Sequence, residues 1–167
     1  MAEKGAYTLD AVAQQVESWK AQGLKVVFTN GVFDVLHVGH VEVLGVAASH
    51  GQKLVVGVNS DASVRRLGKG PDRPIHEEDN RARVLAALRS VDAVVVFEDD
   101  TPLALVNRLQ PDVLVKGGDY DAACTDQNDP RYMVGSAEVK AWGGHAVAVP
   151  LVPGQSTTAT LKKIRTS

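Results

Sequence analysis

The sequence has little of several features that would mark a secreted, membrane or nucleic-acid-binding protein. Cys124 is the single cysteine among 167 residues, so no disulfide can form within the chain, and a reducing compartment suits it. The formal net charge is -2, which gives no general attraction to nucleic acid or to an anionic membrane. No apolar run approaches the ~18 residues of a membrane span, and the start of the chain lacks the apolar segment of a secretory signal. We therefore expect a cytoplasmic protein that neither inserts into a membrane nor binds nucleic acid.

Short apolar segments alternate with segments of helical periodicity along the chain. We predict strands at residues 24–29, 53–59, 93–97, 113–116 and 146–149. We predict helices at residues 9–22, 38–50, 77–90, 102–109, 136–142 and 157–165, with Thr8 and Ser156 as N-caps. This alternation indicates a single-domain, Rossmann-like, doubly wound α/β fold over residues 1–167, in which helices cover both faces of a parallel sheet. An N-terminal helix would occupy residues 1–23 and the core residues 24–165, with a ligand at the carboxyl ends of the strands.

The segment from Gly31 to His40 carries the strongest functional signal. It follows a predicted strand, turns at a glycine and enters a helix, so backbone N–H groups at the turn are available to an anion. His37 and His40 are three residues apart on one side of the first helical turn, and an imidazole can donate a hydrogen bond to a phosphate oxygen. A lone histidine would more often be a surface residue, but two histidines around Gly39 favour a phosphate site. We predict nucleotide contacts from this region at Asn30, Gly31, Val32, Phe33, Gly39 and His40.

The same segment resembles the HxGH signature of the nucleotidyltransferase superfamily that includes the glycerol-phosphate and choline-phosphate cytidylyltransferases. Further motifs occur in the order found in the D-glycero-β-D-manno-heptose 1-phosphate adenylyltransferases, at residues 28–34, 58–64, 73–75 with Arg81, 100–102, 115–120 and 154–158. The similarity covers about residues 24–165. It implies transfer of AMP from ATP to heptose 1-phosphate, which yields ADP-heptose and pyrophosphate for the lipopolysaccharide core. From the length of 167 residues we expect the stand-alone form without the sugar kinase of the bifunctional members, and the resemblance alone implies a homodimer.

The resemblance also assigns the site residues. It implies catalytic roles for His37, His40 and Lys69, and nucleotide contacts from a closing helix that carries Ser156, Thr157, Thr158 and Lys163. We predict that the sugar phosphate is bound by Asp34, Lys69, Arg81, Lys116, Gly117 and Asp119. The resemblance favours Lys69 and Arg81, and the position at the end of a parallel strand favours Lys116. Some of these residues also have structural interpretations: Asp34 can brace the turn, Arg81 can lie on a helix surface and Asp119 can cap a turn. No metal-ligand cluster is evident in the sequence, so we expect Mg²⁺ to be carried by ATP, with few or no protein ligands.

Two other functions stay open at this point. One is a cytidylyltransferase that acts on glycerol 3-phosphate or a related phosphorylated alcohol. The other is a non-catalytic nucleotide-binding module that has kept the fold. The sequence also departs from the resemblance in two places. Val32 stands where many superfamily members have a hydroxyl-bearing residue, and residues 122–133 form a longer segment than we expect, which is a lid, a subunit contact or a surface insertion.

Overall fold

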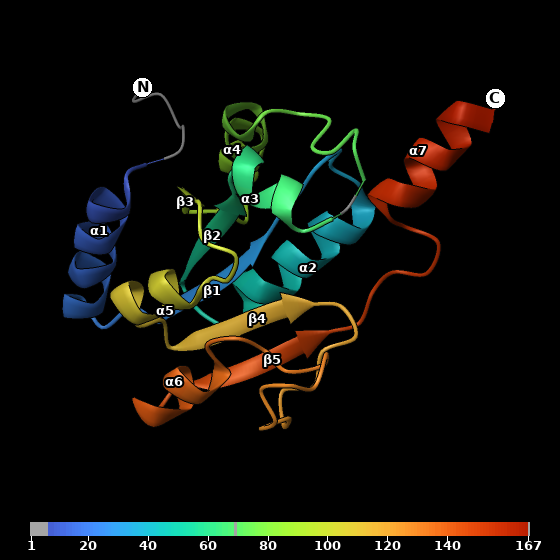
Figure 1. Cartoon of the computed structure of the whole chain (residues 1–167). Helices are drawn as coiled ribbons and strands as arrows, with labels where there is room; N and C mark the ends of the chain where they lie inside the picture. Colours follow the sequence, from blue (N-terminus) through green and yellow to red (C-terminus); the bar gives the residue numbers. More distant parts are fainter. Residues whose placement is uncertain (1–6, 69, 167) are drawn as a thin grey trace.

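The computed structural model describes residues 7–68 and 70–166, which contain one parallel sheet of five strands (Figure 1). The strands are β1 (Val26–Gly31), β2 (Lys53–Asn59), β3 (Ala93–Phe97), β4 (Val113–Gly117) and β5 (His145–Val149), in the spatial order β3-β2-β1-β4-β5. The helices are α1 (Leu9–Ala21), α2 (Val38–Ser49), α3 (Asp61–Arg66), α4 (Glu78–Ala86), α5 (Leu103–Leu109), α6 (Ser136–Ala141) and α7 (Thr157–Thr166). The predicted doubly wound α/β fold is confirmed.

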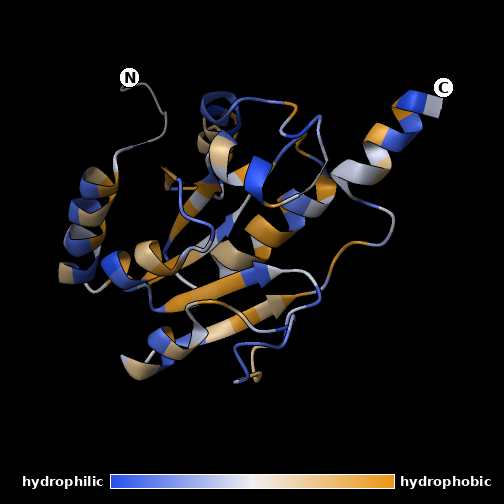
Figure 2. Cartoon of the chain, in the orientation of Figure 1, coloured by the Kyte–Doolittle hydropathy of each residue, from blue (hydrophilic) through white to orange (hydrophobic). Residues whose placement is uncertain are grey.

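Successive residues of each strand are buried on opposite faces of the sheet. Phe28 of β1 packs with the helices α1 and α5, whereas the neighbouring Val27 packs with α2 and α4. Both side chains are fully buried, and each such burial contributes about 1.5–3 kcal/mol. Figure 2 shows the same arrangement as apolar strands under helices whose outer sides are hydrophilic. Because helices cover both faces, a ligand site is confined to the edge where the strands end.

The strand order reverses beside β1, which places two strand ends together. From β1 the chain proceeds outward to β2 and β3 and then returns to β4 on the other side of β1, so the switch point lies between β1 and β4. Open parallel sheets bind ligands in the crevice at such a point. The register pairs Thr29 with Val115, and therefore the polar ends of β1 and β4 lie side by side. Helix α7 lies beyond this same edge, at the end of a long connection from β5 (Figure 1).

Capping residues in the sequence account for the starts of α1 and α7. Thr8 caps α1 by accepting a hydrogen bond from the Ala11 N–H at 3.3 Å, and Ser156 caps α7 by accepting from the Ala159 N–H at 3.0 Å. The predicted helix at 77–90 begins and ends within that range, at Glu78 and Ala86, and the short helix α3 was not predicted. In the described part of the chain, no helix has the length and apolar character needed to cross a membrane.

Candidate active site

A cavity of about 330 Å³ opens at the carboxyl ends of β1 and β4, between the start of α2 and the start of α7. It brings together most of the predicted site residues, although they come from four separate parts of the chain. Those that line it are Asn30, Gly31, Val32, Phe33, Asp34, His37, Gly39, His40, Lys116, Gly117, Ser156, Thr157 and Thr158. Thr29, Val43, Arg73, Tyr120, Leu151 and Gln155 complete the lining.

The two imidazoles form a stacked pair at the start of α2. Their ring centroids are 3.8 Å apart with an interplanar angle of 25°. The Gly39 N–H donates to Nδ1 of His37 at 3.1 Å, and the His37 N–H donates to Nδ1 of His40 at 3.4 Å. A ring nitrogen that accepts a hydrogen bond carries no proton, so in the neutral tautomer the proton of each ring is on Nε2. The backbone of the helix start therefore sets the tautomer of both rings and leaves Nε2–H as the donor.

Burial also favours the neutral form of one ring. His37 is partly buried at the cavity wall, and this desolvation lowers the pKa of its imidazole from the ordinary value. The edge of Phe33 contacts the other ring, His40, with centroids 5.3 Å apart. At neutral pH His37 is therefore suited to donate a hydrogen bond from Nε2 without a net charge. Such a group can stabilise developing negative charge, and it does not need to act as a proton-transferring base.

The turn between β1 and α2 has an uncommon backbone conformation. Phe33 and Val35 both have φ of 51°, in the left-handed region that bulky and β-branched residues rarely adopt. Strain of this kind costs about 1–3 kcal/mol per residue and persists only where the surroundings enforce it. Asp34 lies between them, and its buried carboxylate accepts from the Ile75 N–H at 2.7 Å, the His76 N–H at 3.0 Å and Nε of Arg73 at 2.8 Å.

These three donors determine the ionisation of Asp34. Burial raises the pKa of the carboxyl. The hydrogen bonds from the Ile75 and His76 N–H groups and the positive charge of Arg73 together lower it by more, so the pKa of Asp34 lies below the ordinary value. Both carboxylate oxygens are occupied by protein donors. Asp34 lines the cavity as predicted, but its side chain braces the turn and the segment 73–76, and it does not offer a free oxygen to a sugar phosphate.

The opposite wall of the cavity is made by the end of β4. Nζ of Lys116 donates to Oδ1 of Asn30 at 3.0 Å, across the switch point, and lies 5.4 Å from the centre of the Tyr120 ring. Gly117 has no room for a side chain, because an added Cβ would lie 2.5 Å from Cγ2 of Val43. The glycine therefore lets α2 approach the end of β4 closely.

Helix α7 supplies the remaining wall. The hydroxyl of Thr157 is buried and donates to the Asp34 carbonyl at 2.6 Å, which fixes the first turn of α7 to the turn after β1. Ser156 and Thr158 flank it on the cavity side. The N-terminus of a ten-residue helix carries partial positive charge and free N–H groups, which suit a phosphate. The cavity is thus positive at two walls, with the imidazole pair between them.

Three predicted residues lie outside this cavity. Arg81 is only 2% exposed, and its guanidinium donates to the carbonyls of Val32, His76 and Asn59 and to the carboxylate of Asp61. It therefore cross-links the elements behind the site and does not line this cavity, and a sugar-phosphate contact from Arg81 stays a prediction. Asp119 and Lys163 are exposed and are not part of the lining. Lys69 lies outside the described residues.

The described residues do not offer a resident metal site. No group of three or more histidine, cysteine, aspartate or glutamate side chains in this part of the chain could hold a metal ion. Asp34 is the one carboxylate among the residues that line the cavity, and its oxygens accept three protein hydrogen bonds. Mg²⁺ carried by the nucleotide stays a prediction of the sequence.

The fold and the site together define an α/β nucleotidyltransferase of the Rossmann-like class. The HxGH pair lies at the strand-to-helix turn next to the switch point, in one cavity with the start of α7. The chain belongs to the cytidylyltransferase-like family, whose sequence model matches residues 28–157.

The chain is also similar to individual proteins, both in sequence and in structure. The chain is 55% identical over 159 residues to the bifunctional protein HldE of Mesorhizobium japonicum and 51% identical over 168 residues to that of Gluconobacter oxydans. The matches cover 94% and 100% of this chain but 30% and 33% of those proteins, so the chain spans about a third of their length. A lipopolysaccharide core biosynthesis protein from Thermoplasma volcanium has a TM-score of 0.58 at 25% identity, covering 78% of this chain and 98% of its own. Pantoate-beta-alanine ligase from Francisella tularensis shares the fold, with a TM-score of 0.61 at 16% identity, covering 95% of this chain and 72% of its own.

Proposed function

We propose that the chain transfers AMP from ATP to D-glycero-β-D-manno-heptose 1-phosphate, with ADP-heptose and pyrophosphate as products for the lipopolysaccharide core. The observation that carries the transfer is the His37–His40 pair, which lies in one cavity with Lys116 and the start of α7. The choice of heptose phosphate and ATP is supported by the order of motifs along the sequence and by the HldE relatives at 51–55% identity. It is also supported by the solved lipopolysaccharide core biosynthesis protein.

The reaction needs positioning more than proton transfer. An oxygen of the sugar phosphate attacks the α-phosphorus of ATP, a new P–O bond forms, and the bond from the α-phosphorus to the bridging oxygen breaks. Pyrophosphate leaves with that oxygen and its electron pair. The nucleophile is already an anion, so no strong base is required, and the barrier comes from bringing anions together and from charge on the leaving group.

Each wall of the cavity has one part in this scheme. Nε2–H of His37 and of His40 donates to the oxygens on the α-phosphorus, where negative charge increases in the transition state. One such preorganised donor is worth about 2.7–4 kcal/mol. The ammonium of Lys116 attracts the sugar phosphate from the β4 side, and the N-terminus of α7 binds the outer phosphates of ATP. The two anions are thereby held on opposite sides of the reacting phosphorus, as an in-line displacement requires.

Mg²⁺ enters as MgATP in this proposal, because the described residues supply no metal-binding cluster and the ion neutralises phosphate oxygens on the nucleotide. We place the reaction in the cytoplasm, where ATP is produced. The assembly of the chain into a homodimer stays a prediction of the sequence resemblance.

Pyrophosphate release tests this function directly. The purified chain is incubated with Mg²⁺ and each combination of ATP or CTP with heptose 1-phosphate or glycerol 3-phosphate. Release only with ATP and heptose 1-phosphate supports the proposal. Release only with CTP and glycerol 3-phosphate would establish the alternative cytidylyltransferase instead. If no pair gives release while ATP still binds, the chain is a nucleotide-binding module and the proposal fails.

A further inference from the structure

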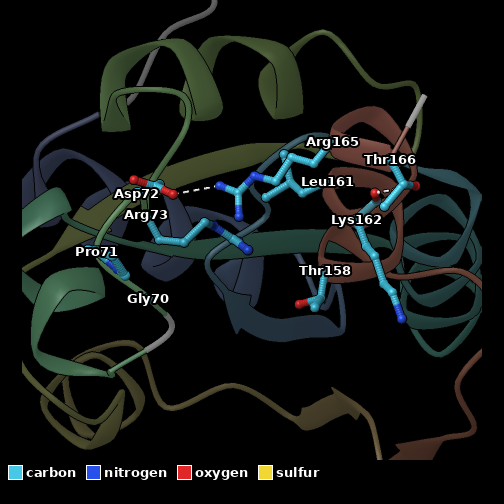
Figure 3. Close-up of a pocket in the computed structure, with 9 residues that line it drawn as sticks. All are labelled: Gly70, Pro71, Asp72, Arg73, Thr158, Leu161, Lys162, Arg165 and Thr166. Carbon is cyan, nitrogen blue, oxygen red and sulfur yellow. Dashed lines mark hydrogen bonds and ion pairs between the residues drawn. The ribbon is translucent and has the colours of Figure 1, made fainter.

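A second cavity, of about 370 Å³, adjoins the first between the loop 70–73 and helix α7 (Figure 3). Arg73 and Thr158 line both cavities. Figure 3 shows Arg73 extending from the loop toward the helix, and Arg165 extending from the helix to pair with Asp72 of the loop at 2.5 Å. With Lys162, this cavity has three cationic side chains against one carboxylate. It is therefore a cationic extension of the candidate active site on its α7 side.

Arg73 differs from the other cations of this cavity in how it is held. Its side chain is only 9% exposed, and Nε donates to the buried carboxylate of Asp34 at 2.8 Å. No described residue accepts a hydrogen bond from either Nη atom. These two atoms are nevertheless not among the sealed polar atoms of the described residues, so they retain access to the cavities that Arg73 lines. A buried guanidinium is thus fixed at one end and presents the other end to a ligand.

The position of the two Nη atoms indicates which part of a bound ligand they would contact. Lys116 and Tyr120 line only the first cavity, on the β4 side, whereas Arg73 lies with Thr158 at the start of α7. A ligand with one phosphate beside the imidazole pair and further phosphates at the α7 N-terminus would extend toward Arg73. The planar fork of an arginine matches the spacing of phosphate oxygens and binds them through two N–H groups at once.

We propose that Arg73 binds the outer two phosphates of ATP, and the pyrophosphate that they become, through its Nη atoms. This assignment rests on the proposed nucleotidyl transfer for its catalytic meaning, but the binding step does not require turnover. Negative charge moves onto the leaving diphosphate as the P–O bond breaks, so the Arg73 contact strengthens in the transition state and assists departure. Asp34 acts as the positioning residue, because its carboxylate fixes Nε and so directs the two Nη atoms.

Calorimetric titration of MgATP, magnesium pyrophosphate and AMP into the wild-type chain and into Arg73→Ala tests the proposal. Loss of a charge-assisted contact should weaken MgATP and pyrophosphate binding by about tenfold to a hundredfold, with AMP affinity within about twofold. Arg108→Ala is the matched control: it removes an arginine that pairs with Glu17 on the surface, 43% exposed, and should change none of the three affinities. Equal weakening of ATP and AMP, or unchanged binding of all three, would overturn the proposal, since a structural role does not distinguish the ligands.

If the alanine variant fails to fold, Arg73→Lys tests the diphosphate contact. This variant keeps a cation beside Asp34 but lacks the two Nη donors of the planar guanidinium. It should bind MgATP about threefold to tenfold more weakly than the wild type and AMP equally well. Wild-type affinity for MgATP in this variant would contradict the two-point contact. If these affinities change as expected while heptose 1-phosphate is never converted, then the proposed function fails and the diphosphate contact stands.

Discussion

Replacement of Asp34 by alanine should destabilise the protein more than any surface change near the site. The substitution leaves the Arg73 guanidinium, 9% exposed, without the carboxylate that pairs with it, and leaves the Ile75 and His76 N–H groups without their acceptor. Removal of one partner of a buried ion pair costs about 3–5 kcal/mol. For a chain of this size that corresponds to a fall in Tm of about 6–20 °C.

Urea unfolding of the wild type, Asp34→Ala and Asp72→Ala at pH 7 provides the measurement. Asp72 is the matched control, because its pair with Arg165 is exposed, 61% at each side chain, and an exposed pair contributes about 1 kcal/mol or less. A loss below about 1 kcal/mol in Asp34→Ala would refute the view that this carboxylate holds the turn.

The pH dependence of the same comparison has a fixed sign. The pKa of Asp34 is lowered in the folded protein, so its contribution to the free energy of unfolding is complete above the unfolded carboxyl pKa of about 3.9. That contribution is lost as the pH falls through the lower folded value. The stability difference between the wild type and Asp34→Ala should therefore be constant from pH 7 to about pH 5 and should narrow in stronger acid. A difference that widens on acidification would contradict the stated hydrogen bonds.

Three further predictions concern the imidazoles and the lysine. His40→Ala should fold normally, and its kcat, measured by pyrophosphate release, should fall by about 10²–10³-fold because a donor to the reacting phosphate is removed. Near-normal turnover would exclude this role. Lys116→Ala should raise the KM for heptose 1-phosphate about tenfold or more with a smaller effect on ATP, whereas Lys53→Ala, whose pair with Asp92 lies at the other end of the sheet, should change neither; equal effects of the two variants would exclude a local contact. The imidazole of His37, followed by NMR, should titrate below the ordinary value of 6.5, and a midpoint at or above 6.5 would show that burial does not dominate its pKa.

The sheet could be predicted because each strand carries its own signal. The bounds of β2 and β3 agree with the sequence prediction, since both are apolar runs between polar segments. Helix α3 was missed because its six residues are too few to show a helical period, and the Ser60 cap that starts it is a common turn residue. Helix propensity alone does not stabilise so short a segment, so short polar helices depend mainly on their tertiary contacts.

The site shows the same distinction between local and distant contacts. The stacked pair of His37 and His40 follows from a spacing of three residues on a helix, which the sequence displays. The role of Arg81 does not, because its guanidinium meets the Val32 carbonyl 49 positions away and the Asn59 carbonyl 22 positions away. When a polar segment contains two arginines, its sequence does not show which of them has a buried side chain in the folded protein. For the same reason the pairing of Arg73 with Asp34, across 39 positions, was visible only in the folded chain.

The central claim, attack by a sugar phosphate oxygen on the α-phosphorus of ATP, is tested most directly by an isotope-transfer experiment. Heptose 1-phosphate labelled with oxygen-18 at its non-bridging phosphate oxygens is incubated with MgATP and the protein. The masses of the products are then measured by mass spectrometry. The account predicts that ADP-heptose retains every labelled oxygen and that pyrophosphate contains none. Label in the pyrophosphate, or the absence of ADP-heptose when both substrates are bound, would contradict it.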